Sequence, residues 1–136
     1  MVILFDQFHL PEDVFEVVFA TEQQVIVGRM LVEEFKHNGG SLGKTEMSLF
    51  ANRLHDGTVM EVVEDVGPVK RTKKIQMSYN KRQFYDRILT PMRSMGMIDY
   101  DMYKKKYFIS NKFNDSVKKI GLMWIQEVNK PITKPE

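Results

Sequence analysis

The chain has 136 residues, which suits one domain with a hydrophobic core of its own. It contains no cysteine, which excludes disulfides and thiolate-bound metals, and its three histidines form no ligand motif. We therefore expect no metal and no other cofactor. No apolar run reaches the roughly 18 residues of a membrane helix, and Met1 to Phe5 lack the basic start of a secretory signal, so a soluble, cytoplasmic protein is expected.

Charge is divided unevenly along the chain. Residues 1–69 hold 4 Lys and Arg against 12 Asp and Glu, a net charge of −8, whereas residues 70–136 hold 16 against 6, a net charge of +10. Clustered cations attract a polyanion such as nucleic acid. The alternative is that the acidic half neutralises the basic half within one fold.

Two amphipathic helices are predicted in the first half, after an N-terminal extension over 1–20 that gives no clear pattern. The sequence Thr21-Glu22-Gln23-Gln24 is typical of a capping box and predicts a helix over 22–37. Its apolar stripe is Val27, Met30, Leu31 and Phe35, and Asn38-Gly39-Gly40 ends it. A second helix over about 45–55 has the stripe Met47, Phe50, Ala51 and Leu54 and ends at Asp56-Gly57.

The segment after the second helix allows two interpretations. Residues 58–66 are rich in valine, Gly67-Pro68 is a turn signal, and residues 70–77 can return as a second strand. The segment is thus either a β-hairpin or a loose loop.

A third helix is predicted up to Gly96, beginning near Ser78 or Asn80, either of which can cap it. Its apolar face is Phe84, Tyr85, Ile88, Leu89 and Met92. Pro91 conflicts with an unbroken helix, because an interior proline costs about 3 kcal/mol. Thr90 and Pro91 could instead start a new turn, with Thr90 as its N-cap.

A hairpin and a final helix complete the prediction. Ile98, Tyr100 and Met102 alternate with Asp99 and Asp101, which predicts a half-buried strand over 97–103. A second strand follows over 107–110, with the lysine triplet 104–106 as the tip. A helix over about 114–128 is expected to bury one apolar stripe, and a frayed tail over 129–136 follows. The stripe is Val117, Ile120, Gly121, Trp124 and Val128.

The stretch from Asn80 to Asn111 (NKRQFYDRILTPMRSMGMIDYDMYKKKYFISN) resembles the recognition helix and wing of winged helix-turn-helix proteins. Its most specific part is an amphipathic helix ending in Met95-Gly96-Met97-Ile98, which is similar to the family's turn into the first wing strand. The resemblance implies an α+β, mostly helical winged helix domain over 21–128, with an inserted hairpin or loop and an extra C-terminal helix. The chain departs from the family at Pro91 and at residues 56–79, where a helix-turn-helix normally has a turn of a few residues.

The resemblance further implies a sequence-specific double-stranded DNA-binding protein, a transcriptional regulator that reads the major groove with helix 80–95. Glutamine can pair with adenine, and arginine or lysine with guanine. The candidates for base contacts are Asn80, Lys81, Arg82, Gln83 and Arg87. The wing over 97–110 would neutralise phosphates with Lys104, Lys105 and Lys106. A second basic block is formed by Lys70, Arg71, Lys73 and Lys74.

Each of these sets also has a plain structural interpretation. The polar residues of the helix can be its solvated face, and a lysine-rich tip can protect a sheet edge. The basic block in the insertion can be a flexible, solvated loop.

The final helix lies outside the three-helix core, so its apolar stripe needs a partner. It can pack on the domain's own first helix. It can also pair with the same helix of a second subunit, forming a homodimer with two recognition helices about one DNA turn apart.

Two other classes of function were weighed. A winged helix can serve as a protein-interaction module in a transcription or replication assembly. An enzyme is not expected, because Gly39 to Thr45 ends like a phosphate-binding loop but has Asn38 where the first glycine is required. The segment also follows a helix rather than a strand, and no paired carboxylates or histidine-centred cluster compensate.

Overall fold

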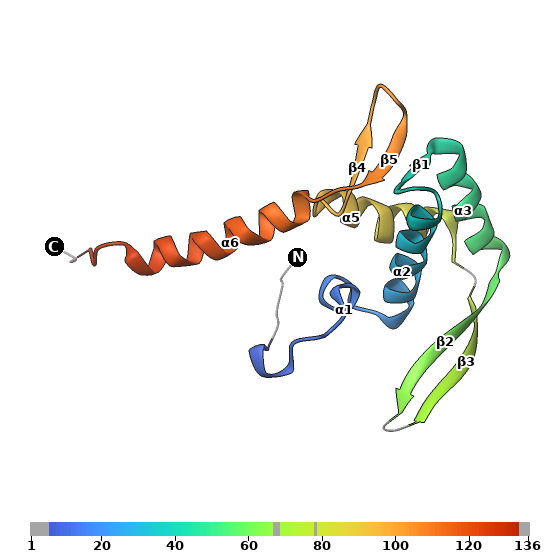
Figure 1. Ribbon diagram of the computed structural model, residues 1–136, viewed down its shortest axis with the longest axis horizontal. Coiled ribbons are helices and arrows are strands. Elements are labelled where there is room, and N and C mark those ends of the chain that lie inside the picture. Colours follow the sequence, from blue (N-terminus) through green and yellow to red (C-terminus); the bar gives the residue numbers. More distant parts are fainter. Residues whose placement is uncertain (1–5, 67–68, 78, 134–136) are drawn as a thin grey trace.

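Two helices and a short strand form the first half of the body in the computed structural model, which describes residues 6–66, 69–77 and 79–133 (Figure 1). Helix α2 (Glu22–His37) begins with the predicted capping box. The Thr21 hydroxyl accepts from the Gln24 backbone N–H at 3.2 Å, and the Gln24 side chain accepts from the Thr21 backbone N–H at 3.3 Å. Helix α3 (Lys44–Asp56) ends at Gly57, whose φ of 89° requires glycine. Both predicted helices are confirmed.

A strand that the sequence did not predict lies between these helices. Strand β1 (Ser41–Gly43) pairs with the later strand β5 in an antiparallel sheet of order β1-β5-β4. Leu42, at its centre, is buried in the core. This pairing links the hairpin after the third helix to the start of α3. The sheet and the helices together form an α+β arrangement that is compatible with a winged helix.

The insertion between the second and third helices is a hairpin, so the loop alternative is wrong. Strands β2 (Thr58–Val66) and β3 (Val69–Met77) are antiparallel and in register from Thr58 opposite Met77 to Val66 opposite Val69. The hairpin projects from the body, at the end where α3 stops (Figure 1). The turn signal Gly67-Pro68 lies outside the described residues.

The third helical segment is continuous but not α-helical throughout, and we call residues 81–94 the composite helix. It consists of α4 (Lys81–Phe84), a π-helical turn η2 (Tyr85–Leu89) and α5 (Thr90–Ser94). The expected restart with Thr90 as N-cap is wrong, because Thr90 has helical φ and ψ of −60° and −48°. Its N–H donates to the Tyr85 carbonyl, five residues back. The wider turn accommodates Pro91, which cannot donate to the carbonyl of residue 87.

The second hairpin is shorter than predicted, and we call residues 98–109 the wing. Strand β4 (Ile98–Asp101) and strand β5 (Lys106–Ile109) are antiparallel. Met102 was expected on the strand's buried face, but it lies in the turn and is 78% exposed. Lys106 was expected at the tip and instead begins β5, opposite Asp101 and Gly43. The composite helix leads into the wing through Gly96, which has a φ of 82°.

The core lies between α2, α3, the composite helix and the root of the wing. Every residue of the predicted stripes in α2 and α3 is buried except Met30, which packs against the core from its edge. Two adjacent residues of the composite helix, Ile88 and Leu89, are both buried, as the shift in register at the π turn allows. The fully buried members include Leu31, Phe35, Met47, Leu54, Phe84, Ile88, Met92 and Ile98.

The N-terminal extension contains a short 3₁₀ turn, η1 (Gln7–His9), and a helix, α1 (Val14–Val18), which packs on α2. Asp13 caps α1 and is ion-paired with Arg29 of α2. Phe19 belongs to the core and lies against Gly28, where a Cβ would come within 2.7 Å of its ring. Part of this extension therefore belongs to the body.

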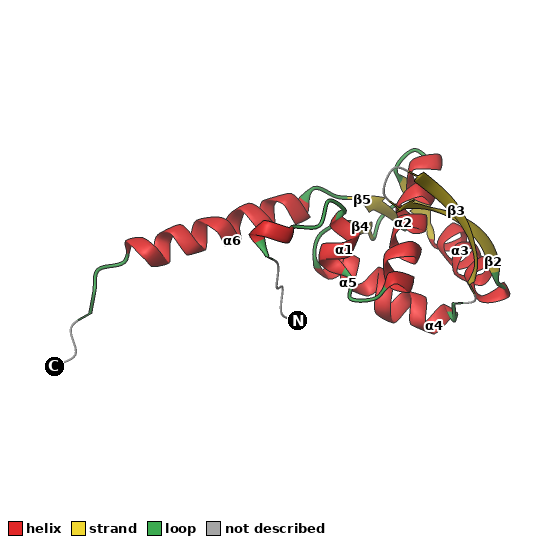
Figure 2. Ribbon diagram, turned by 90° about the horizontal axis from the view of Figure 1, so that it is seen from below, coloured by secondary structure: helices red, strands yellow, loops and turns green. Residues whose placement is uncertain are grey.

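Helix α6 (Lys112–Asn129) extends away from the body (Figures 1 and 2). Its first turn is attached at Gly96, whose carbonyl accepts from the Phe113 N–H at 3.0 Å. The stripe is not buried within the described chain, so the alternative in which it packs on the chain's own first helix is wrong. Val117, Ile120, Trp124 and Val128 are between 51% and 69% exposed. Over the described residues, no helix is long and apolar enough to cross a membrane.

Candidate nucleic-acid interface

The first turn of the composite helix is held by two polar side chains that the sequence nominated as base readers. Asn80 caps the helix, since its side-chain oxygen accepts from the Arg82 N–H at 2.8 Å. The Lys81 ammonium donates to the Ser48 hydroxyl of α3 at 2.9 Å. The Asn80 cap fixes the first turn of the helix, and the Lys81 hydrogen bond attaches that turn to α3. Because both side chains are engaged in these hydrogen bonds, they have less freedom to reach a ligand.

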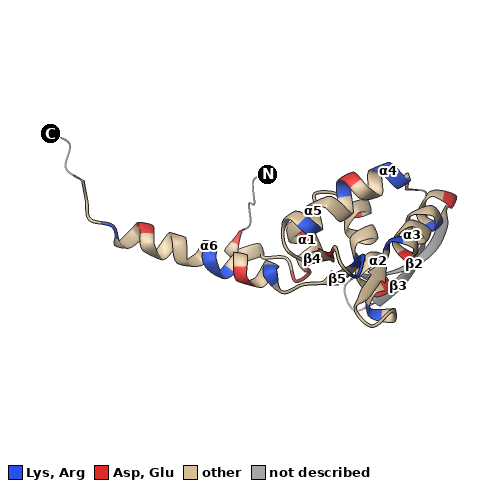
Figure 3. Ribbon diagram, turned by 90° about the horizontal axis from the view of Figure 1, so that it is seen from above, with Lys and Arg blue, Asp and Glu red and all other residues tan. Residues whose placement is uncertain are grey.

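Arg82, another of the nominated residues, is almost fully exposed. Its side chain is 90% exposed, and its Nε lies 3.7 Å from a carboxylate oxygen of Asp86, one turn along the helix. Such an exposed pair contributes little stability, so Arg82 remains available to a phosphate or a base. Gln83, in contrast, is half-buried. Figure 3 shows the basic start of α4 on an open face of the body.

Arg87 is exposed and lies near the buried Tyr79 at the root of the insertion. Burial raises the pKa of the Tyr79 hydroxyl, and the nearby Arg87 guanidinium partly opposes this rise. Gln83 and Arg87 are four residues apart, a spacing that places two side chains on one face of an α-helix. Arg87 lies within the π turn, so that spacing does not apply here, and Gln83 is half-buried whereas Arg87 is exposed.

Three lysines of the wing are exposed: Lys104 and Lys105 lie in the turn, and Lys106 begins β5. The turn is fixed by Asp101, whose carboxylate accepts from the backbone N–H groups of Tyr103 (2.9 Å) and Lys104 (3.1 Å). Lys105 has a positive φ of 54°. The tip is therefore an ordered turn with its cations directed into solvent.

Tyr103 is 99% exposed beside these lysines, so packing within the chain does not account for it. Together with Met102 it gives the tip an apolar surface among the cations. The sequence contained this signal, because both residues directly precede the lysine triplet, but the predicted strand placed them in the sheet.

The root of the wing holds two cations that the sequence analysis missed. Arg93 of α5 lies over the rings of Tyr100 (5.6 Å) and Tyr107 (5.7 Å), and Lys44 of α3 lies 5.5 Å from the Tyr100 ring. The two tyrosines pack on each other at 4.7 Å. Because these residues come from four separate elements, α3, α5, β4 and β5, only the tertiary structure brings them together. The ring contacts hold Arg93 in place where the composite helix meets the wing.

Arg93 also lines a small hollow of about 280 Å³ with Thr90, Ser94 and Asp99. Asp99 is ion-paired with Lys112 at the start of α6. The hydrogen bond from Lys112, together with the Tyr100 N–H, lowers the pKa of Asp99 below its ordinary value. The Asp99 charge is thus neutralised within the chain. Two hydroxyls and a fixed guanidinium remain around the hollow.

The basic block of the insertion is placed differently from the wing lysines. In the register of β2 and β3, Lys70 stands opposite Asp65, Arg71 opposite Glu64, and Lys74 opposite Glu61. Opposite charges at directly paired positions stabilise an antiparallel ladder. Lys73 is the exception, because it stands opposite Val62. Three of the four cations of the block therefore stand at positions paired in register with acidic residues.

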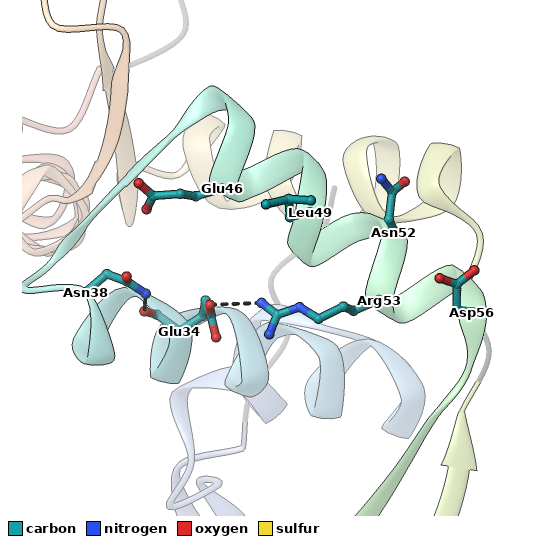
Figure 4. Close-up of a pocket in the computed structure, with 7 residues that line it drawn as sticks. All are labelled: Glu34, Asn38, Glu46, Leu49, Asn52, Arg53 and Asp56. Carbon is teal, nitrogen blue, oxygen red and sulfur yellow. Dashed lines mark hydrogen bonds and ion pairs between the residues drawn. The ribbon is translucent and has the colours of Figure 1, made fainter.

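A second concave region, of about 470 Å³, lies between α2 and α3 (Figure 4). Its charged lining residues are Glu34, Glu46, Asp56 and Arg53, and Arg53 is ion-paired with Glu34 at 2.9 Å. The three carboxylates make it unfavourable for an anionic ligand. It opens on the side of α3 that faces away from the composite helix, which passes behind α3 in Figure 4.

No group of three or more potential ligands for a metal ion occurs within the described parts of the chain. Comparison with protein-family models, with curated proteins and with solved structures gave no match. Function is therefore inferred from the residues of the chain and their arrangement.

Proposed function

We propose that this protein binds double-stranded DNA, with the composite helix in the major groove and the wing along the adjacent backbone. We further propose that it recognises a preferred DNA sequence and acts as a transcriptional regulator, and that it is a cytoplasmic protein. The proposal adds no catalytic step and requires no cofactor.

One observation carries the proposal: two adjoining elements present cations that the rest of the chain leaves in solvent. Arg82 and Arg87 are exposed on the composite helix, and three lysines are exposed on the wing. The acids on these two elements are Asp86, Asp99 and Asp101. Asp86 and Asp99 are ion-paired, and Asp101 accepts two backbone hydrogen bonds in the wing turn. Because the composite helix and the wing run in different directions, their cations could each face one of the two phosphate backbones that border a groove.

The two elements have different roles in this proposal. Arg82 and Arg87 can reach base edges, where an arginine pairs with guanine through two hydrogen bonds. The wing lysines and Arg93 neutralise phosphates, which orients the protein without reading sequence. Tyr103 and Met102 at the tip would lie against the sugar edges of the groove.

A protein-interaction module is the second candidate, and the exposed stripe of α6 favours it. Salt dependence separates the two candidates, because phosphate contacts weaken steeply as ionic strength rises and an apolar contact does not.

The proposal is tested by electrophoretic mobility shift with the purified protein and fragments of DNA from upstream of its own gene. We expect one fragment to be retained at moderate salt in the presence of excess random duplex. Equal retention of all fragments would support DNA binding but contradict sequence preference. Retention of none would contradict the proposal.

A further inference from the structure

We infer that α6 is the dimerisation element of this protein and that it pairs antiparallel with α6 of a second copy, each Trp124 seated over Gly121 of the partner. The inference rests on α6 alone and does not require that the protein bind DNA.

Over the part of the chain that the structure describes, the apolar stripe of α6 is left exposed. Val117 is 51% exposed, Trp124 69% and Val128 61%, and Ile120 and Ile125 flank them at 56% and 55%. A single amphipathic helix of this length is marginal in water, so most of its stability must come from packing. The five side chains expose on the order of 500 Å² of apolar area, near the upper end for patches on a monomer. A symmetric pair would bury on the order of 1,000 Å², which is the size at which specific interfaces begin.

The stripe has the spacing of a coiled-coil seam. Its central members, Val117, Gly121, Trp124 and Val128, follow one another at intervals of four, three and four residues. In an antiparallel pair with its two-fold axis midway between Gly121 and Trp124, Val117 of one helix faces Val128 of the other. Gly121 faces Trp124, and each of these layers occurs twice.

Residue volumes select this orientation. A parallel pair would place Trp124 against Trp124 and leave a void between two Gly121 residues, whereas the antiparallel pair matches the largest residue with the smallest. Gly121 needs such an explanation, because glycine disfavours a helix interior. The chain itself gives it no role: its φ is not positive, and a Cβ at this position would meet nothing within 4 Å.

Charge favours the same orientation. The first half of α6 carries Lys112, Lys118 and Lys119 against Asp115, so a parallel pair would bring two positive ends together. The antiparallel pair separates the two positive ends and places each beside the other helix's last turn, where Glu127 is ion-paired with Lys130 at 2.8 Å. It also opposes the two helix dipoles.

This arrangement holds the two bodies at opposite ends of a rod of about 27 Å, the length of 18 helical residues. If the proposed DNA binding is correct, the length of this rod and the size of the two bodies together set the spacing of the two half-sites.

Disulfide cross-linking tests the orientation directly, because the chain has no cysteine of its own. We expect the full-length single variants Val117→Cys and Val128→Cys, mixed under mild oxidation, to form a mixed dimer. Neither variant alone should form a disulfide-linked dimer. Two Val117 positions lie about 16 Å apart in the proposed pair, and a disulfide spans only about 4.4–6.8 Å between Cα atoms. Lys119→Cys, on the opposite side of the helix, is the matched control.

The oligomeric state tests the interface itself. We expect light scattering to show a dimer for the parent protein and a monomer for Val128→Asp, with the thermal transition of the body unchanged because Val128 is exposed within the chain. The swap Gly121→Trp with Trp124→Gly should restore the dimer that either single change weakens. A monomeric parent protein would overturn the inference, and a Val117–Val117 cross-link would overturn the antiparallel orientation.

Discussion

The two hairpins of this protein carry similar runs of cations but place them differently. The wing is joined to the core through β1, and its lysines are exposed in or directly after an ordered turn. The insertion pairs only with itself among the described strands, and three of its four cations stand opposite acids. Along the sequence the two blocks look equivalent. The number of lysines is similar in the two blocks. What differs is the strand register, which sets whether an acid stands opposite each cation, and the pairing of the hairpin with the rest of the sheet.

The largest effect is expected from the wing. Changing Lys104, Lys105 and Lys106 to alanine should weaken binding to every duplex about equally. It should also reduce the slope of log affinity against log salt by up to roughly 3 units, because each phosphate contact releases about one counterion. Fluorescence anisotropy over a salt series measures both quantities.

The matched control removes three lysines of α6 and its end, Lys118, Lys119 and Lys130, which gives the same loss of net charge. We expect this control to leave the slope nearly unchanged. Equal slopes for the two triple variants would mean that net charge, not the wing, determines the affinity.

Arg87 should show a different pattern. Arg87→Ala should cost about 1–3 kcal/mol on the preferred site and little on random duplex, if its guanidinium pairs with a guanine. Competition binding with both duplexes measures the difference. A uniform loss on both duplexes would instead assign Arg87 to the backbone, beside the root of the insertion where Tyr79 lies.

A smaller effect of opposite sign is expected at Asp86, an acid on the exposed side of the composite helix. Asp86→Asn removes a carboxylate that phosphates would repel and releases Arg82 from its ion pair. Affinity for all duplexes should rise severalfold at low salt, and the gain should shrink at high salt. A loss of affinity would indicate that Asp86 itself contacts a base.

The smallest effect is expected from the insertion. Changing Lys70, Arg71, Lys73 and Lys74 to alanine should lower the salt slope by about 1 unit or less, although four charges are removed. The converse variant, with Glu61 and Glu64 changed to glutamine and Asp65 to asparagine, should raise affinity. A slope change as large as that of the wing variant would contradict the comparison between the two hairpins.

The helices of the body could be predicted because local signals and the core agree in them. The capping box at Thr21 and the stripes of α2 and α3 each indicate the same boundaries that the structure has. Strand β1 escaped prediction because it has three residues and exists only through pairing with β5, which is distant in sequence. The π turn was not predicted either. The sequence shows that Pro91 conflicts with an unbroken α-helix, but it does not show that a wider turn removes the conflict.

The candidate site divides in the same way. The exposed lysines of the wing followed from a hairpin with a basic tip. The fixing of Arg93 by Tyr100 and Tyr107 did not, because it requires contacts between α5 and both wing strands. The stripe of α6 was predicted, but a stripe in a sequence does not reveal whether its partner lies in the same chain.

The central claim is that the composite helix and the wing bind the backbone of double-stranded DNA, and the salt dependence of binding by the unmodified protein tests it most directly. Fluorescence anisotropy with one labelled duplex, titrated at several salt concentrations, gives the slope of log affinity against log salt. With at least four phosphate contacts, from Arg93, Lys104, Lys105 and Lys106, we expect a slope of about −3.6 or steeper. Binding that does not change with salt, or no binding at low salt, would contradict the claim.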